Sequence, residues 1–181
     1  MSFDKQPFLT SESLTLRPLA DLDHAGLFAA AQDPLTWAGH HAPDRYKPEA
    51  FAAYFAALLK SGSMLTIIDN ATAKIIGCSA YYTAPDRPGT ISIGFTFLER
   101  SYWGGKTNFA IKTLMLEHAF ASFADVWFHI GPNNLRSQHA TLKLSAKFVE
   151  DVTLNLGGSP APWKVYKLTN TDWRQRATLS S

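Results

Sequence analysis

One alternating segment, from Thr90 to Leu98, constrains the fold more than any other part of the sequence. The large apolar residues at every second position are Ile91, Ile93, Phe95 and Phe97, and the small residues between them are Ser92, Gly94 and Thr96. A period of two predicts a β-strand whose apolar face, with all four large residues, packs against a core. The small face leaves room for a ligand or another backbone, although an ordinary solvent-exposed face fits the pattern equally well.

A glycine pair and an amphipathic helix follow this strand. Gly104 and Gly105 precede a predicted helix from Thr107 to about Phe123, whose apolar residues recur at helical spacing. Glycines can turn backbone N–H groups toward a ligand, and a helix N-terminus adds partial positive charge, so the loop is a candidate phosphate site. Taken alone, such a turn is a weak signal. A nucleotide-binding P-loop is excluded because its first glycine would fall at Arg100.

The remaining pattern completes an α+β fold. The first predicted helix is capped by Asp21 or Asp23 and runs to about Gln32, and two others cover 48–61 and 134–145. The remaining predicted strands cover 14–19, 64–69, 74–82, 126–130, 148–154 and 163–168. Short turns between the strands favour one central, largely antiparallel sheet with helices against it. The length of 181 residues fits a single domain over 1–181, with a core of about 10–170.

Composition narrows the function classes. Lys and Arg number 17 and Asp and Glu 15, and they form no basic run, so the sequence does not indicate a nucleic-acid binder. One cysteine, Cys78, allows no internal disulfide and is expected in the core. The absence of a long apolar run or a signal-like N-terminus predicts a soluble cytoplasmic protein without a membrane partner. The six histidines have no metal-ligand spacing, so no metal is expected, and His118 and His129 are interpreted as packing or surface residues.

Several motifs in order resemble the Gcn5-related N-acetyltransferase (GNAT) superfamily, and within it the ribosomal-protein N-terminal acetyltransferases. The segments that carry the resemblance are Leu14-Thr15-Leu16-Arg17-Pro18-Leu19, Ile93-Gly94-Phe95, Tyr102-Trp103-Gly104-Gly105-Lys106-Thr107-Asn108, Asn134-Leu135-Arg136-Ser137 and Lys143-Leu144-Ser145-Ala146. It covers roughly residues 10 to 170 and implies a layered α/β/α fold with a splayed, mostly antiparallel mixed sheet.

The resemblance also implies an activity and a site. The protein would move acetyl from acetyl-CoA, its co-substrate, to a primary amine of a protein N-terminus or a small molecule, by direct attack. It would act as a monomer or homodimer. The implied CoA-binding residues are Phe97, Leu98, Trp103, Gly104, Gly105, Lys106, Thr107, Asn108, Asn134 and Arg136. Ser137 and Asn134 would be catalytic, and the acceptor site would involve Trp37, His40, His41, Tyr46 and Ser92.

This sequence departs from the family pattern at several positions. Relatives often carry a glutamate, a candidate base, where this chain has Ser92, and many use a tyrosine as general acid where it has Thr141. Lys106 and Asn108 replace small residues of the loop. These departures keep a second hypothesis open, a catalytically inactive CoA-binding module with a regulatory role.

Overall fold

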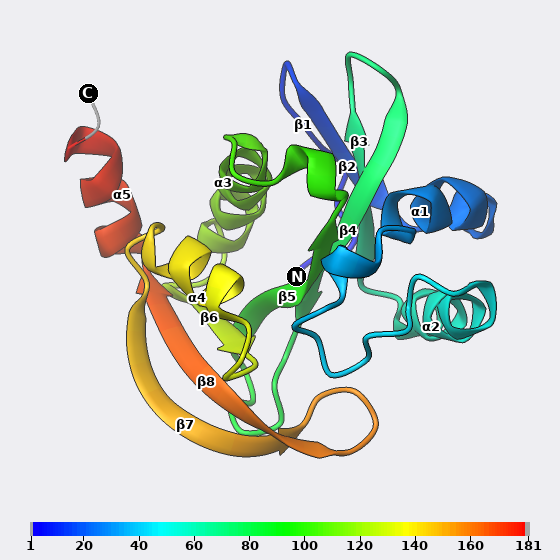
Figure 1. Ribbon diagram of the computed structural model, residues 1–181. Helices are drawn as coiled ribbons and strands as arrows, with labels where there is room; N and C mark the ends of the chain where they lie inside the picture. Colours follow the sequence, from blue (N-terminus) through cyan, green and yellow to red (C-terminus); the bar gives the residue numbers. More distant parts are fainter. Residues whose placement is uncertain (1, 180–181) are drawn as a thin grey trace. The chain divides into compact units, whose positions relative to one another are not determined.

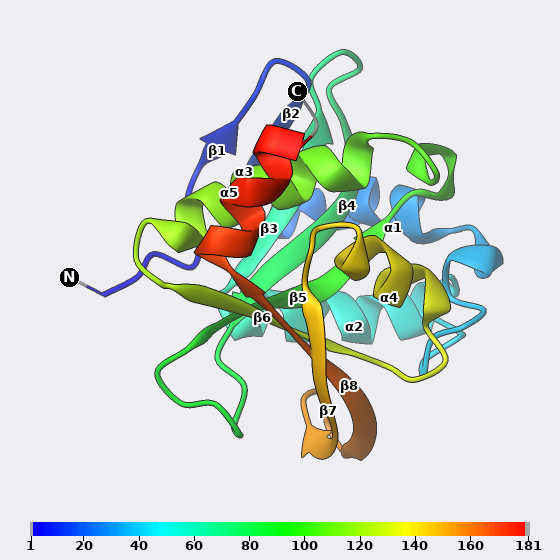
Figure 2. The same ribbon diagram turned by 90° about the vertical axis from the view of Figure 1, so that its left-hand side faces the viewer.

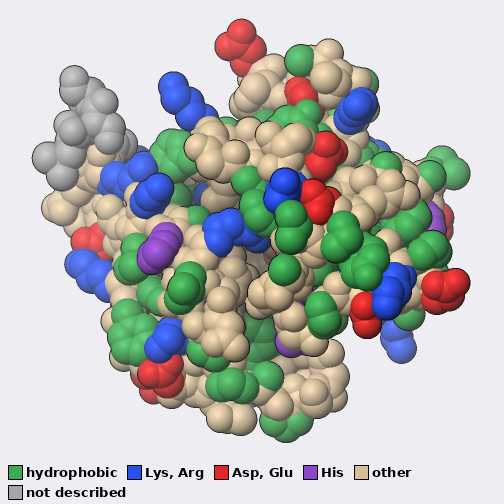
Figure 3. Space-filling view, in the orientation of Figure 1, with side chains coloured by type: hydrophobic (Ala, Val, Ile, Leu, Met, Phe, Trp, Pro, Cys, Tyr) green, Lys and Arg blue, Asp and Glu red, His purple; other side chains and the backbone are tan. Residues whose placement is uncertain are grey.

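The computed structural model describes residues 2–179 and divides the chain into two compact units. The first contains the residues up to Tyr81 together with Phe95–Met115, and the second contains Tyr82–Gly94 and the residues from Leu116 onward. The predicted single domain over 1–181 stays a prediction. No helix within residues 2–179 is long and apolar enough to cross a membrane. On the face in Figure 3, acidic and basic side chains are interspersed.

The first unit is a sheet with helices. Its elements are β1 (Leu9–Thr10), β2 (Leu14–Pro18), α1 (His24–Ala31), α2 (Pro48–Ser61), β3 (Met64–Asp69), β4 (Lys74–Tyr82), the later part of β5 (Ile91–Leu98), the larger part of α3 (Thr107–Phe120), and the 3-10 turns η1 (Asp21–Asp23), η2 (Pro34–Thr36) and η3 (Arg100–Tyr102). The strand order is β1-β2-β3-β4-β5, and each pair from β1 to β4 is antiparallel (Figure 1). Helices α1 and α2 contact each other, and buried Cys78 lies in the core that they share.

Helix α2 forms as its sequence predicts. Pro48 stands at its first position, where the missing N–H costs nothing, and Gly62 ends it with a left-handed φ of 60°. Phe51, Phe55 and Leu58 lie one helical turn apart and are buried in the core.

Helix α1 starts where one of the two predicted caps stands. Asp23 is at the N-cap position, but its side chain makes no capping hydrogen bond to α1. Its carboxylate instead accepts two hydrogen bonds from the Arg17 guanidinium, at 2.7 and 2.8 Å, and one from the Thr66 hydroxyl at 3.0 Å. Asp23 therefore ties α1 to strands β2 and β3, because a buried carboxylate needs a charged partner more than a helix needs its cap.

The strand order in the second unit is β5-β6-β8-β7. It contains the start of β5, the end of α3, β6 (Asp125–Ile130), α4 (Leu135–Leu142), β7 (Lys147–Asn155), β8 (Pro160–Thr169) and α5 (Asn170–Leu179). Strands β5 and β6 are parallel and pair at Ile91↔Val126 and Ser92↔Trp127, whereas β8 is antiparallel to β6 and β7. Figure 2 shows β7 and β8 as a long hairpin. The mixed sheet with helices confirms the α+β prediction, while β1 and α5 were not predicted.

Strand β5 departs from the predicted alternation at one residue. Ile91, Ile93 and Phe97 are buried as expected, but Phe95 is 40% exposed and has a φ of 51°. A left-handed residue breaks the period of two, because it rotates the strand locally and turns the side chain away from its expected face. The prediction of Phe95 as a core residue is therefore wrong.

Candidate active site

The loop between β5 and α3 is fixed at its first end by side chains of the first unit. The Trp103 indole N–H donates to the Leu98 carbonyl at 2.9 Å, and the Tyr102 hydroxyl donates to the Asp69 carboxylate at 2.7 Å. Gly104 then takes a φ of 73°, a conformation that glycine adopts without a steric cost. These contacts hold the turn in place before the helix begins.

Four amides in this turn and at the start of the helix have no internal partner. Among the residues that the structure describes, the backbone N–H groups of Gly104, Lys106, Thr107 and Asn108 donate no hydrogen bond. The first bond of the helix runs from the Ala110 amide to the Lys106 carbonyl at 2.9 Å. Gly104, Gly105 and Lys106 are exposed, so free N–H donors, a helix N-terminus and a lysine occur together. This arrangement can bind a phosphate group.

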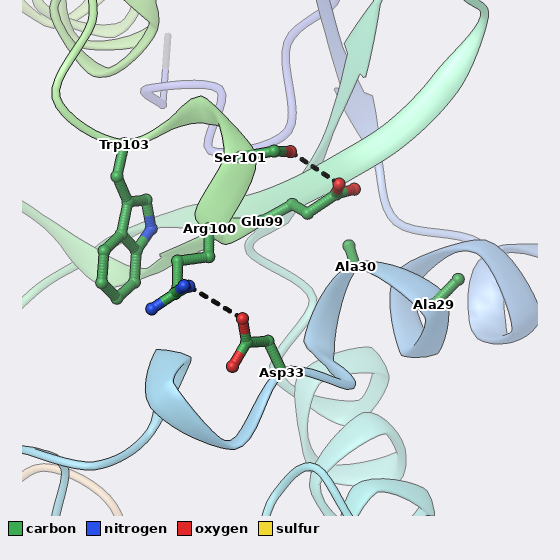
Figure 4. Close-up of a pocket in the computed structure, with 7 residues that line it drawn as sticks. All are labelled: Ala29, Ala30, Asp33, Glu99, Arg100, Ser101 and Trp103. Atoms are coloured by element: carbon green, nitrogen blue, oxygen red, sulfur yellow. Dashed lines mark hydrogen bonds and ion pairs between the residues drawn. The ribbon is translucent and has the colours of Figure 1, made fainter.

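A cavity of about 540 Å³ adjoins the loop within the first unit (Figure 4). It is lined by Ala29, Ala30, Asp33, Glu99, Arg100, Ser101 and Trp103. The Arg100 guanidinium forms an ion pair with the Asp33 carboxylate at 2.8 Å, and the Ser101 hydroxyl donates to Glu99 at 2.7 Å. The cavity therefore combines an apolar floor from α1 with polar groups at the end of β5.

Two predicted cofactor residues can contribute only through their backbone. The Phe97 and Leu98 side chains are 5% and 6% exposed, and Phe97 packs against the rings of Trp37 and Tyr54. The Leu98 carbonyl is already used by Trp103. Arg136, the cofactor residue predicted in the second unit, is exposed on the first turn of α4.

The predicted acceptor residues differ in what they expose. They are Trp37, His40, His41, Tyr46 and Ser92. Trp37 is 1% exposed and donates its indole N–H to the Ala31 carbonyl at 2.8 Å, so it supports the loop rather than lining its surface. Burial, with the positive charges of Arg45 and His41, lowers the pKa of His40 to about 3, so this imidazole is neutral. His41 stacks on His40 and is exposed, and Tyr46 is half-buried.

Ser92 is fully buried, and the structure places a group of polar side chains beside it in the second unit. The Tyr82 hydroxyl lies 2.9 Å from His129 Nδ1, and His129 Nε2 lies 3.5 Å from the Asp86 carboxylate. Burial of the imidazole lowers the pKa of His129, although Asp86 opposes this effect. The neutral ring can accept the Tyr82 proton at Nδ1 while Nε2–H faces the carboxylate. Sequence reasoning treated His129 as packing and missed Tyr82 and Asp86.

The two predicted catalytic residues lie on the first turn of α4. The Asn134 side-chain oxygen accepts a hydrogen bond from the Ser137 amide at 3.2 Å and so caps the helix. Within residues 2–179, the Asn134 Nδ2 group and the Ser137 hydroxyl have no hydrogen-bond partner. Gln138 was not predicted, yet its amide donates to the carbonyls of Gly131 and Pro132 and fixes the turn before α4. The site thus holds two available donors on a rigid turn.

The described part of the chain contains no group of three His, Cys, Asp or Glu side chains that could hold a metal ion. Comparison with curated proteins finds no significant match. Solved structures do match in fold. A GCN5-related N-acetyltransferase from Brucella melitensis is 16% identical, with a TM-score of 0.79 over 98% of this chain and 85% of its own.

Two further solved structures with a similar fold are RimJ and a ribosomal-protein acetyltransferase. Mycobacterium smegmatis RimJ, in complex with CoA-disulfide, is 15% identical with a TM-score of 0.65 over 92% of this chain and 88% of its own. The ribosomal-protein-S5-alanine acetyltransferase from Vibrio fischeri is 16% identical with a TM-score of 0.65 over 93% and 99%. The family model described as an acetyltransferase (GNAT) domain matches residues 13–147. Because that match covers most of its length, the chain belongs to the GNAT acetyltransferase family.

Proposed function

We propose that the protein transfers acetyl from acetyl-CoA to a primary amine, as a member of the branch that includes RimJ. The observation that carries this proposal is the group of four free amides at Gly104, Lys106, Thr107 and Asn108, which suits the CoA pyrophosphate. Lys106 adds a positive charge beside it. The acceptor in this proposal is a protein N-terminal amine or a small-molecule amine, and the name of the Vibrio fischeri relative supports the first.

The proposed reaction is a direct attack. The amine nitrogen bonds to the thioester carbonyl carbon, the carbon–sulfur bond breaks, and CoA leaves as a thiolate. The unpartnered hydroxyl of Ser137 would protonate that thiolate, and the free Asn134 amide would donate to an oxygen that gains charge. The attacking amine must also lose a proton.

We propose that Tyr82 and His129 accept this proton. They would take the role of the glutamate that relatives often carry at the position of Ser92. The amine proton passes to the Tyr82 oxygen as the tyrosine proton passes to His129 Nδ1, 2.9 Å away. The imidazolium that forms is stabilised by the Asp86 carboxylate. A neutral His129, with its lowered pKa, is suited to accept this proton at neutral pH.

Cofactor binding is tested with a matched pair of charge substitutions. Gly105 and Gly157 are both exposed, and a Cβ at either meets no atom within 4 Å. Gly105→Asp places a carboxylate among the free amides and is expected to abolish the thermal stabilisation that acetyl-CoA gives. Gly157→Asp should keep it. Wild-type protein at micromolar acetyl-CoA should gain stability as RT ln(1 + [L]/Kd), and no gain would contradict the proposal.

A catalytically inactive CoA-binding module is the second candidate, and the replacement of a glutamate by Ser92 favours it. Release of free CoA thiol over a panel of primary amines separates the two functions. Amine-dependent thiol release identifies an enzyme. Thermal stabilisation by CoA without thiol release from any amine would support the inactive module.

A further inference from the structure

Arg45 lies in the loop before α2, and its guanidinium has no anionic partner among the residues that the structure describes. Its central carbon lies 3.9 Å from the Tyr54 ring centre and 5.6 Å from that of Trp37. Within the described residues 2–179, its N–H groups donate to no acceptor. The neighbouring carboxylate of Asp44 pairs instead with Lys47 Nζ at 2.8 Å. The two rings therefore hold the guanidinium in place while its hydrogen bonds are unused.

Arg45 is partly shielded from water. Desolvation lowers the pKa of Arg45, yet a guanidinium stays charged at any physiological pH. The same charge helps to lower the pKa values of His40 and His41, after the larger effect of their own burial. A half-buried cation with free donors gains most from an anion, because such hydrogen bonds are strong where water is limited.

The same loop and helix border a second cavity in the first unit, of about 450 Å³. Its lining is mostly small and apolar: Ala42, Pro43, Asp44, Arg45, Ala50, Ala53, Tyr54 and Ala57. Arg45 is the one side chain in this lining that carries a positive charge, whereas Asp44 is neutralised by Lys47. Small alanines along α2 leave space for a ligand beside the guanidinium.

We propose that Arg45 binds an anionic group of the acceptor, a carboxylate or a phosphate, in the cavity between this loop and α2. The planar fork of guanidinium donors matches two oxygens of either group. The inference deepens the proposed acetyltransferase function, since the acceptor would carry its anion at a distance from the amine that reacts. Arg45 acts here as a specificity-determining residue and takes no part in the chemical step.

The first test compares acceptors that differ only in charge, using thiol release. The pairs are O-phosphoethanolamine against ethanolamine, and short peptides with Asp against Asn at the second position. In wild-type protein, kcat/KM for one anionic member should exceed that of its neutral partner at least about tenfold, and which pair responds distinguishes phosphate from carboxylate. Arg45→Gln should remove this preference, whereas Lys47→Gln, a loop cation already paired with Asp44, should keep it. Equal preference in wild type and Arg45→Gln would overturn the inference, as would no preference at all.

A second measurement does not need turnover. Inorganic phosphate or acetate is titrated against protein saturated with CoA, so that the loop at Gly104 is already filled, and thermal stability is followed. Stabilisation of wild type and Lys47→Gln but not of Arg45→Gln supports the inference. Equal stabilisation of all three proteins, or of none, contradicts it. If CoA itself does not raise the thermal stability, the proposed function is contradicted. The comparison of Arg45→Gln with wild type in phosphate or acetate still tests whether Arg45 binds an anion.

Discussion

Lys112 offers the sharpest test of how the first unit is packed. It lies on α3, is 7% exposed, and donates its only hydrogen bond within the described residues to the Thr96 hydroxyl at 2.9 Å. Thr96 is in turn hydrogen-bonded to Ser79 at 2.7 Å. No carboxylate of the described residues pairs with the Lys112 ammonium group. Burial consequently lowers the pKa of Lys112 from 10.5 to about 7.

The lowered pKa of Lys112 determines how the free energy of unfolding changes with pH. Between pH 7 and pH 10.5 the unfolded chain holds the lysine proton and the folded chain does not. The free energy of unfolding therefore rises with pH over that window, by up to about 1.4 kcal/mol per pH unit from this group. The whole gap between 10.5 and about 7 amounts to about 5 kcal/mol of destabilisation at low pH.

Urea unfolding of wild type and Lys112→Met from pH 6 to pH 10.5 measures this contribution. Methionine has a similar length and no charge, so the variant should be more stable than wild type near pH 6, by a few kcal/mol. The advantage should shrink steadily as pH rises and be nearly gone at pH 10.5. Lys60→Met, on the exposed side of α2, is the control and should show no such trend.

A difference between Lys112→Met and wild type that stays constant with pH would refute the reasoning. It would mean that Lys112 keeps its proton in the folded state, and hence that water or an anion reaches its ammonium group. A variant less stable than wild type at every pH would refute it as well, because the hydrogen bond to Thr96 would then outweigh the cost of burial.

Two further predictions concern charged groups in the two units. Asp23→Asn leaves Arg17 without its partner and should lower the free energy of unfolding by about 3 kcal/mol in urea titration, whereas Asn at exposed Asp21 should change little. Because the pKa of Asp23 is lowered, the wild-type contribution is present above the ordinary carboxyl pKa and is lost as pH falls through the folded value. For His129→Gln, kcat should fall about 10²–10⁴-fold with the KM for acetyl-CoA unchanged. In wild type, kcat/KM should show one acid limb at the pKa of the acceptor amine and a second limb, absent from His129→Gln, below pH 6.5. The second limb lies there because burial, helped by Arg87 and opposed by Asp86, lowers the pKa of His129, and a His129-dependent limb above pH 6.5 would contradict the assignment.

The sequence predicted best what depends on local chemistry. Pro48 and Gly62 mark the ends of α2 because a missing N–H and a left-handed φ are needed only there. The loop from Trp103 was predicted for the same reason, since glycine freedom and a helix start are local properties.

Contacts between distant residues account for what the sequence did not predict. Helix α5 is polar, and its buried residue Trp173 donates its indole N–H to Glu117 at 2.7 Å. Nothing near Trp173 in the sequence indicates that partner. Trp37 was predicted to belong to the acceptor site, but it is buried through its contacts with Ala31 and the ring of Phe97.

Strand β5 shows how a correct pattern can receive an incomplete interpretation. Its small residues were expected to leave space for a ligand or another backbone, and a close approach does occur, but the approaching group is the ring of Tyr82. A Cβ on Gly94 would lie 2.9 Å from Tyr82 Cε1, and Ser92 is completely buried beside the same side chain. Glycine and serine are therefore needed here so that the tyrosine can reach His129 with its hydroxyl. If the proton leaves through Tyr82, no glutamate is needed at the position of Ser92. A glutamate there would add a second carboxylate, besides that of Asp86, to a buried space that the Tyr82 ring already fills.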